Sequence, residues 1–287
     1  KTMLKDGWFT EYGEMWKGQA MSIQVKEVLY QGKSKFQDIL VFDSVSYGRV
    51  LVLDGVIQIT ERDEAAYQEM GTQVAIHSHP NPKNVLIIGG GDGGMVRDVA
   101  KHPDISIDLC ELDEEVIRVS KKFFSDKISF AFDKASVHIR DGALFMEERL
   151  SFYDIIIVDS TDPIGPADSL FTKSFYEKCF SALKPQGIFV CQAECIYLHL
   201  DSMKKWHSIL KSLFPVVDYC IAMIPTYPSG QIGFFCCCKD KSMSCTKPLR
   251  SPSSDVLKRL SYYDSDIHEA AFKLPLFAKR SLFSSDE

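Results

Sequence analysis

The pattern of apolar and polar positions divides the chain into two parts. Over residues 22–60, short runs rich in β-branched and aromatic residues alternate apolar with polar positions. The Asp54-Gly55 pair between two of these runs predicts a tight hairpin, so we expect a small antiparallel sheet. A helix should follow from Thr60 to about Ile76, because Thr60 can cap it and acidic residues fill its first turn.

From residue 83 the pattern changes to uninterrupted apolar runs, each followed by a helical stretch. Such runs are typical of parallel strands buried on both faces, and repeated strand–helix units imply helices on both sides of one sheet. Two late strands, about 216–223 and 231–238, have only a turn between them and indicate an antiparallel edge hairpin. The expected fold is α/β: a Rossmann-like, methyltransferase-type sheet over residues 77–287, and an N-terminal β-rich domain with its linking helix over residues 1–76.

Residues 89–94, Gly-Gly-Gly-Asp-Gly-Gly, join the first of these strands to its helix. Glycines at such a turn let the backbone approach a ligand closely. Gly89, Gly91 and Gly94 have the spacing of a dinucleotide site. Asp92, however, occupies the place where a pyrophosphate would bind, and two like charges ~4 Å apart cost about 4 kcal/mol at an effective dielectric of ~20. A cationic nucleoside, such as an S-adenosyl compound, fits better.

Acidic residues stand at or just after the ends of the first four parallel strands. In chain order they are Asp92, Glu111, Asp113, Asp141, Asp159 and Asp162. Ligands of open α/β sheets bind beyond the carboxyl ends of the strands, so these side chains should line one strongly negative crevice. Clustered carboxylates need cations to stay ionised. Polyamine and sulfonium ligands would supply such cations. A divalent metal ion would also supply one, but few histidines accompany these acids, which disfavours a metal site.

Three of these positions suggest particular roles. Glu111 can accept hydrogen bonds from the two ribose hydroxyls of a nucleoside, and Asp141-Gly142 can face an adenine amino group. Asp159 and Asp162 belong to a loop stiffened by prolines. An alkylamine is protonated at pH 7, because its pKa lies near ~10.4, and a carboxylate can orient it and accept its proton. Helix capping or a plain turn is the alternative role at each position.

Composition and charge limit the possible partners and location of the protein. A net charge of −6 and a pI near 5.7 disfavour nucleic acid as a partner. No apolar run approaches the ~18 residues that span a membrane, and the first residues lack a secretory pattern, so we expect a cytoplasmic protein. The 9 cysteines, three of them adjacent at 236–238, lack zinc-type spacing and are expected to be buried, reduced thiols.

Several longer motifs occur in a characteristic order. They are Gly-Gly-Gly-Asp-Gly-Gly, Glu-Leu-Asp-Glu, Asp-Ser-Thr-Asp-Pro-Ile-Gly-Pro-Ala, Gln-Ala-Glu-Cys and Pro-Thr-Tyr-Pro-Ser-Gly-Gln-Ile-Gly, preceded by Leu53-Asp-Gly-Val-Ile-Gln-Ile-Thr and Ala66-Tyr-Gln-Glu. Over nearly the whole chain they resemble the polyamine aminopropyltransferases, most closely the spermidine synthases of eukaryotes. The resemblance implies that decarboxylated S-adenosylmethionine donates an aminopropyl group to putrescine, giving spermidine and methylthioadenosine. It implies no metal or redox cofactor, and a homodimer formed through the N-terminal domain.

The resemblance also implies roles, position by position. Asp159 matches the catalytic base. The donor would be held by Gln37, Gln68, Asp92, Glu111, Asp141 and Gly142, with Pro166, Ala167 and Leu170 walling the adenine. Putrescine would contact Trp16, Tyr67, Asp159, Asp162, Gln192 and Tyr227. The loop 160–172 would close as a lid. Lys17, where the family usually has proline, and Tyr197, where members often have tryptophan, leave details of the amine pocket open.

Other functions remain as alternatives. Putrescine N-methyltransferase shares most of these motifs but uses S-adenosylmethionine itself, whose carboxylate Asp92 and Asp159 should repel. Spermine synthase needs a longer acceptor channel and usually has an extra N-terminal domain. A non-catalytic polyamine-binding homologue would be expected to lose Asp159 or Tyr67, and a dinucleotide oxidoreductase is opposed by Asp92.

Overall fold

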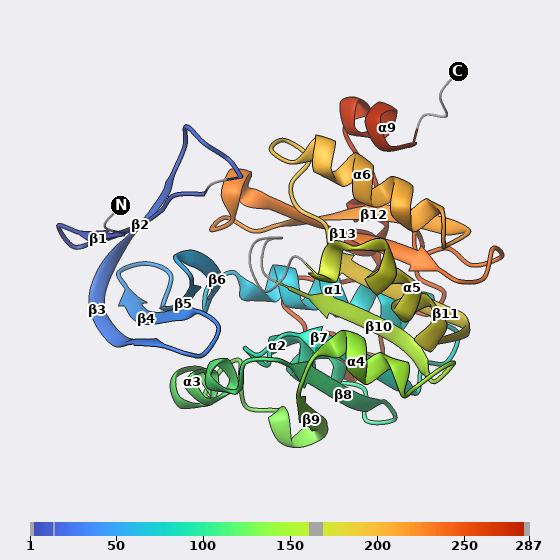
Figure 1. Cartoon of the computed structure of the whole chain (residues 1–287), viewed down its shortest axis with the longest axis horizontal. Helices are drawn as coiled ribbons and strands as arrows, with labels where there is room; N and C mark the ends of the chain where they lie inside the picture. Colours follow the sequence, from blue (N-terminus) through green and yellow to red (C-terminus); the bar gives the residue numbers. More distant parts are fainter. Residues whose placement is uncertain (1–2, 14, 161–168, 284–287) are drawn as a thin grey trace.

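Two β-sheets stand side by side, and helices cover the larger one (Figure 1). The structure is a computed structural model that describes residues 3–13, 15–160 and 169–283. Within the described residues, no helix is long and apolar enough to cross a membrane.

The first sheet has six antiparallel strands in chain order. They are β1 (Leu4–Lys5), β2 (Trp8–Glu11), β3 (Met21–Lys33), β4 (Asp38–Ser44), β5 (Arg49–Leu53) and β6 (Val56–Thr60). The predicted hairpin turn is confirmed: Asp54 has φ of 46° and Gly55 of 81°, the left-handed backbone that an Asp-Gly pair tolerates. The first two strands were not predicted, because they are too short to show an alternating pattern.

Helix α1 (Glu64–Ser78) connects the two sheets and is buried on all sides. Its start was predicted wrongly at Thr60: the N-cap is Asp63, and the Thr60 hydroxyl donates a hydrogen bond to Asp63 Oδ1 at 2.6 Å. Of its residues only Ala65 is not buried. The helix packs against α2 and the face of the second sheet. The domain boundary between residues 76 and 77 stays a prediction.

The second sheet has seven strands in the order β12-β13-β11-β10-β7-β8-β9. They are β7 (Asn84–Gly89), β8 (Ser106–Glu111), β9 (Ala135–Ile139), β10 (Tyr153–Asp159), β11 (Leu183–Gln192), β12 (Val216–Met223) and β13 (Gln231–Cys238). This confirms the Rossmann-like, mostly parallel sheet. The predicted hairpin exists, but its antiparallel strand β13 lies between β11 and β12, so β12 forms the edge.

Helices on both faces explain the uninterrupted apolar runs. The helices are α2 (Gly94–Val99), α3 (Glu114–Phe124), α4 (Gly142–Glu147), α5 (Lys173–Ala182), α6 (Leu200–Lys211), α7 (Ser254–Leu257), α8 (Ser265–Ala271) and α9 (Leu276–Phe283). Val85 and Ile87 of β7 pack in the core under α1 and α2, whereas Leu86 and Ile88 pack in the core on the opposite face. A central strand is therefore apolar at every position.

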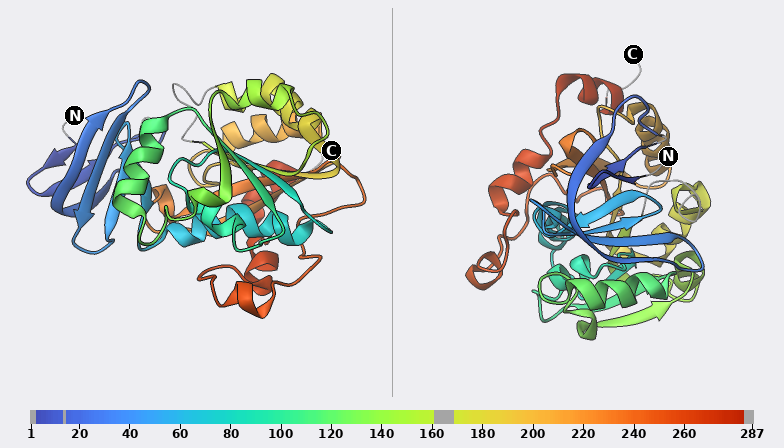
Figure 2. Two further views of the ribbon diagram at one scale, coloured as in Figure 1. Left: turned by 90° about the horizontal axis from the view of Figure 1, so that it is seen from below. Right: turned by 90° about the vertical axis from the view of Figure 1, so that its left-hand side faces the viewer.

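The parallel register aligns the carboxyl ends of the strands near the first sheet. Asp159 at the end of β10 pairs with Gly89 at the end of β7, while Cys110 of β8 pairs with Ile88. Helix α3 packs its apolar face against the first sheet, which therefore stands at this edge (Figure 2, left).

A buried network of charges lies between α1 and α2. Arg97 binds Glu64 at 2.7 Å and Asp98 at 2.9 Å, and Lys101 binds Asp98 at 2.6 Å. Burial raises the pKa of Glu64 to about 7, although Arg97 lowers it. Glu69 accepts three backbone hydrogen bonds from residues 261–263, each 2.8 Å long, and so attaches the C-terminal segment to α1.

Candidate active site

Two adjoining cavities lie at the carboxyl ends of the strands. They share Val56 and Gln58 from the first sheet and Asp92, Asp159 and Ser160 from the second. We call the larger the nucleoside lobe, because the glycine turn and Glu111 line it, and the smaller the amine lobe. Asp92 and Asp159 are therefore the acidic side chains at the junction of the two lobes.

The two junction carboxylates are oriented by hydrogen bonds from their neighbours. Asp92 Oδ1 accepts hydrogen bonds from the backbone N–H of Gly94 at 2.7 Å and from Gln68 Nε2 at 3.0 Å. Asp159 Oδ1 accepts one from the Tyr67 hydroxyl at 2.7 Å. The predicted donor-contacting Gln68 thus donates to Asp92 rather than standing alone in the cavity.

Burial gives both carboxyls raised pKa values. The pKa of Asp159 is raised to about 8, first by burial and then by the negative charge of Asp92, against a smaller lowering by Tyr67. Burial also raises the pKa of Asp92. Among the described residues, no lysine or arginine lines the amine lobe, and burial lowers the pKa of its one histidine, His199, to about 4. The junction is consequently suited to a ligand that brings its own positive charge.

The nucleoside lobe places Glu111 directly against the glycine turn. A Cβ atom on Gly91 would lie 2.9 Å from Glu111 Oε2, so a larger residue at this position would require the Glu111 carboxylate to shift. Glu111 Oε1 accepts a hydrogen bond from the backbone N–H of Asp113 at 2.9 Å. Burial raises the pKa of Glu111 to about 7.

Other predicted donor residues also line this lobe. Gln37 lies in the turn between β3 and β4, and its Nε2 donates to Asp113 Oδ2 at 2.9 Å, which ties this turn to the start of α3. Asp141 lines the lobe while capping α4, since its Oδ1 accepts from Leu144 N at 3.0 Å. Gly142 and Leu170 line the same lobe.

The amine lobe is walled by aromatic rings. Tyr67 and Tyr227 meet edge to face with ring centroids 5.7 Å apart, and the Tyr227 hydroxyl donates to the carbonyl of Gln58. Trp16 is buried and lines the lobe, as does Gln192, whose Nε2 donates to Glu194 Oε1 at 3.1 Å.

Among the lobe residues that the sequence reasoning missed are two acids and a histidine: Glu11, Glu194 and His199. Glu194 was within the quoted Gln-Ala-Glu-Cys motif, and its buried side chain and φ of 64° mark it as unusual for a non-glycine residue. Glu11 Oε2 accepts a hydrogen bond from Ile57 N at 2.8 Å. Acids therefore occur in this lobe beyond the Asp92–Asp159 junction.

Some predicted positions are not part of this description. Asp162, Pro166 and Ala167, and most of the predicted lid, lie outside the described residues. Neither Lys17 nor Tyr197 is among the residues lining the two lobes, and Tyr197 instead packs against Phe277 with ring centroids 5.2 Å apart. Within the described part of the chain, no three His, Cys, Asp or Glu side chains are grouped to hold a metal ion.

Comparison with known families identifies the family to which the chain belongs. The family model described as the spermine/spermidine synthase domain matches residues 64–247, and one described as the spermidine synthase tetramerisation domain matches residues 7–61. The chain belongs to the spermine/spermidine synthase family. It is therefore an aminopropyltransferase, as the motifs predicted.

Individual members of the spermine/spermidine synthase family are similar over almost their full length. A spermidine synthase of Schizosaccharomyces pombe is 50% identical over 96% of this chain and 94% of its own, and one of Dictyostelium discoideum is 47% identical over 97% and 98%. A crystal structure of a spermidine synthase in complex with the transition-state analogue AdoDATO superposes with a TM-score of 0.87 at 33% identity, covering 97% of this chain and 96% of the other.

Proposed function

We propose that this chain is a spermidine synthase, which transfers the aminopropyl group of decarboxylated S-adenosylmethionine to putrescine. The observation that carries the proposal is the pair of carboxylates, Asp92 and Asp159, at the junction of a nucleoside lobe and an aromatic, acidic amine lobe. A donor that carries a sulfonium and an ammonium, and an acceptor that carries two ammoniums, supply the charge that this junction lacks.

In the proposed reaction, Asp159 is the catalytic base. It orients the attacking putrescine nitrogen and receives its proton, directly or through water. The nitrogen forms a bond with the donor methylene carbon while the carbon–sulfur bond breaks, and the electron pair stays on sulfur. The sulfonium becomes the neutral thioether of methylthioadenosine. Tyr67 orients Asp159 through its 2.7 Å hydrogen bond. The rest of the rate enhancement comes from aligning the nitrogen, carbon and sulfur atoms.

The remaining roles follow the two lobes. On the donor side, Asp92 would bind the aminopropyl ammonium while Gln68 orients it, and Glu111 would bind the ribose. Gln37, Asp141, Gly142 and Leu170 would complete the nucleoside contacts, with Pro166 and Ala167 from the adjoining loop. On the acceptor side, Trp16, Tyr227, Gln192 and Asp162 would surround putrescine, and we add Glu11 and Glu194 for its second ammonium.

The decisive experiment compares donors. The purified protein is incubated with putrescine and either decarboxylated S-adenosylmethionine or S-adenosylmethionine, and the products are identified by mass spectrometry. We expect spermidine and methylthioadenosine with the first donor and no transfer with the second, because Asp92 and Asp159 repel its carboxylate. N-methylputrescine from the second donor would instead show a methyltransferase. Spermine, formed when spermidine replaces putrescine as the better acceptor, would show a spermine synthase.

The substitution Glu111→Gln tests the nucleoside lobe. Hydrogen bonds to charged groups contribute about 1.5–3 kcal/mol, so we expect methylthioadenosine to bind about 10–100-fold more weakly. Isothermal titration calorimetry measures the affinity directly. Glu115→Gln is the control, because Glu115 lies on the neighbouring helix α3 but does not line the lobe. Equal affinity in both variants would contradict the ribose assignment.

The pH dependence of the rate should follow Asp159. Its pKa is raised to about 8, and the ionised carboxylate is the form that binds cations and accepts a proton. Thus kcat/KM for putrescine should rise as the pH increases from 6 towards 9. Bound substrates add positive charge beside Asp159 and lower its pKa, so the kcat profile should rise at lower pH than the profile of kcat/KM for the donor, which reports the free enzyme. Initial rates measured across this pH range test the prediction. A kcat/KM that falls with rising pH would contradict the role of Asp159 as the catalytic base.

The assembly is the remaining part of the proposal. The matched tetramerisation domain, residues 7–61, supports an oligomer. We propose that the unit is a homodimer formed through the first sheet, where Trp8 and Val45 are 45% and 59% exposed. Multi-angle light scattering would measure the mass directly. Cytoplasmic location stays a prediction.

A further inference from the structure

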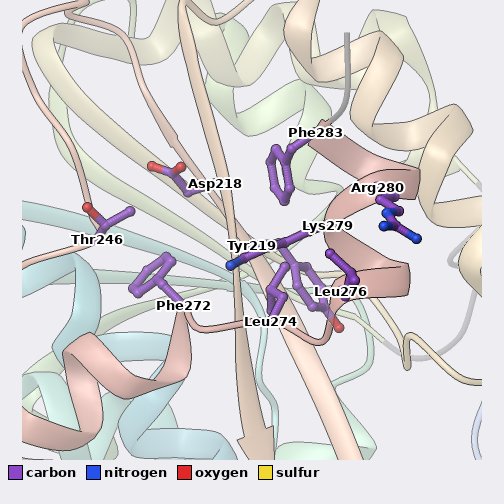
Figure 3. A pocket seen from close by; sticks show the side chains of 9 residues that line it. All are labelled: Asp218, Tyr219, Thr246, Phe272, Leu274, Leu276, Lys279, Arg280 and Phe283. Carbon is purple, nitrogen blue, oxygen red and sulfur yellow. The ribbon is translucent and has the colours of Figure 1, made fainter. Parts of the chain in front are cut away.

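A third cavity, of about 430 Å³, lies away from the active site, between α9 and the edge of the second sheet (Figure 3). Its residues come from β12, the chain before α9, and α9 itself. They are Asp218, Tyr219, Thr246, Phe272, Leu274, Leu276, Lys279, Arg280 and Phe283. Cavities of this size accommodate small organic ligands. We call it the α9 cleft.

Asp218 contributes an unsatisfied carboxylate to the cleft. Its Oδ2 atom is buried and has no hydrogen-bond partner among the described residues. Burial raises the pKa of Asp218 to about 6, with a smaller lowering by Lys211. A buried acceptor without a partner is unfavourable, so a hydrogen-bond donor placed there would be stabilising.

Lys279 contributes a cation opposite this carboxylate. Figure 3 shows its side chain extending from α9 into the middle of the cleft, on the side where Asp218 and Thr246 lie. Lys279 makes no ion pair with any described residue, Asp218 included, and the same holds for Arg280 nearby on α9. The cleft therefore presents an acid and a base that face the same space without neutralising each other.

Apolar side chains form the rest of the wall. Phe272 and Leu274 lie below Asp218 in Figure 3, and Leu276 and Phe283 lie on the α9 side. They give an apolar body of a ligand a place to bind, next to the two charged groups. On the inner side the Tyr219 ring lines the cleft, while its hydroxyl donates to the carbonyl of Glu194 at 2.7 Å, in the amine lobe.

We infer that the α9 cleft is a second binding site, for an α-amino acid or similar zwitterion with a bulky apolar side chain. The ammonium binds Asp218, the carboxylate binds Lys279, and the apolar side chain lies on Phe272, Leu274 and Phe283. A ligand that carries both an ammonium and a carboxylate satisfies both groups at once.

Other small-molecule classes fit the cleft less well. A polyamine would satisfy Asp218 but would be repelled by Lys279 and Arg280, which have no acidic partners among the described residues. A phosphate compound would satisfy the two cations but would bring a second negative charge beside Asp218. The inference rests on this cleft alone and does not depend on which reaction the active site catalyses.

Three matched probes test the inference: L-phenylalanine, phenethylamine, which lacks the carboxylate, and 3-phenylpropionate, which lacks the ammonium. Titration of the full chain by ligand-observed NMR measures their binding. We expect L-phenylalanine to bind with a Kd of about 1 mM or below, and each single-charge probe to bind about tenfold more weakly. Asp218→Asn and Lys279→Gln should each weaken L-phenylalanine about tenfold.

Controls separate this cleft from other sites. Asp255→Asn and Lys258→Gln remove an exposed charge pair outside the cleft, with side chains 89% and 78% exposed, and should leave binding unchanged. Asp159→Asn should also leave it unchanged, which excludes binding in the active site. Thermal unfolding confirms that each variant is folded. Absence of saturable binding, equal binding of all three probes, or binding unaffected by Asp218→Asn would each overturn the inference.

Discussion

The substitution Asp159→Asn is expected to reduce kcat by about 10²–10⁴-fold, the usual contribution of a general base. Asparagine fills the same space but has no charge and cannot accept the proton of the amine. Methylthioadenosine should bind nearly as tightly as in the wild type, because it is neutral at the sulfur and its ribose contacts Glu111 in the other part of the crevice. Initial-rate kinetics and calorimetry on the same preparation measure both effects. Turnover like that of the wild type would remove Asp159 from the proposed role.

The stability of this variant provides the control against unfolding. The folded-state pKa of Asp159 is about 8, above the ordinary 3.8, so the folded protein holds this proton more tightly than the unfolded chain. Ionisation of Asp159 therefore opposes folding. Its effect is to lower the free energy of unfolding of the wild type as the pH rises from about 4 to 8. Asparagine cannot ionise, so the variant does not bear this unfavourable ionisation. The variant should consequently unfold at a higher temperature than the wild type at pH 8, with a smaller difference at pH 5.

The substitution Arg97→Leu should give the largest loss of stability, about 3–5 kcal/mol in the free energy of unfolding. Arg97 is the shared partner of Glu64 and Asp98, and its side chain is only 9% exposed. Without it, two buried carboxylates lose their bidentate donor. Urea denaturation at pH 7.5 measures the change.

A matched substitution shows whether burial is the reason. Arg118→Leu breaks a still shorter contact, with Glu115 at 2.5 Å, but that arginine side chain is 54% exposed. Exposed ion pairs contribute little, so the stability should change only slightly. The loss in Arg97→Leu should shrink as the pH falls, because the pKa of Glu64 is about 7 beside Arg97 and rises further without it, so that the carboxyl takes up a proton. Similar losses in both variants would contradict the importance of the buried network.

Local patterns allowed much of the fold to be predicted. The last two strands were placed at 216–223 and 231–238, as observed, because a proline precedes the first and a proline- and glycine-containing turn separates them. Helix α3 likewise follows local signals, since Asp113 caps it through Glu115 N and its charges follow the helix dipole. The position of β13 inside the sheet could not be predicted, because strand order depends on contacts between distant segments.

The active site also combines residues that local sequence predicts with residues that only contacts between distant segments bring in. The acids at the strand ends could be predicted to converge, because parallel strands end at one edge of a sheet. Glu11 and Glu194 could not be found in this way. Glu11 belongs to the four-residue strand β2, and it reaches the amine lobe only because the first sheet stands against the second. Glu194 follows β11 in a left-handed backbone conformation that no sequence pattern announces.

Helix α1 has a consequence for how the protein can change over generations. One side of the helix carries Tyr67 and Gln68 to the junction, another carries Glu64 to Arg97, and a third carries Glu69 to the C-terminal segment. With no face left in solvent, almost any replacement in this helix disturbs either the chemistry or the architecture. Natural variation among homologues should therefore be least along α1 and greater on α3, which turns one side to water.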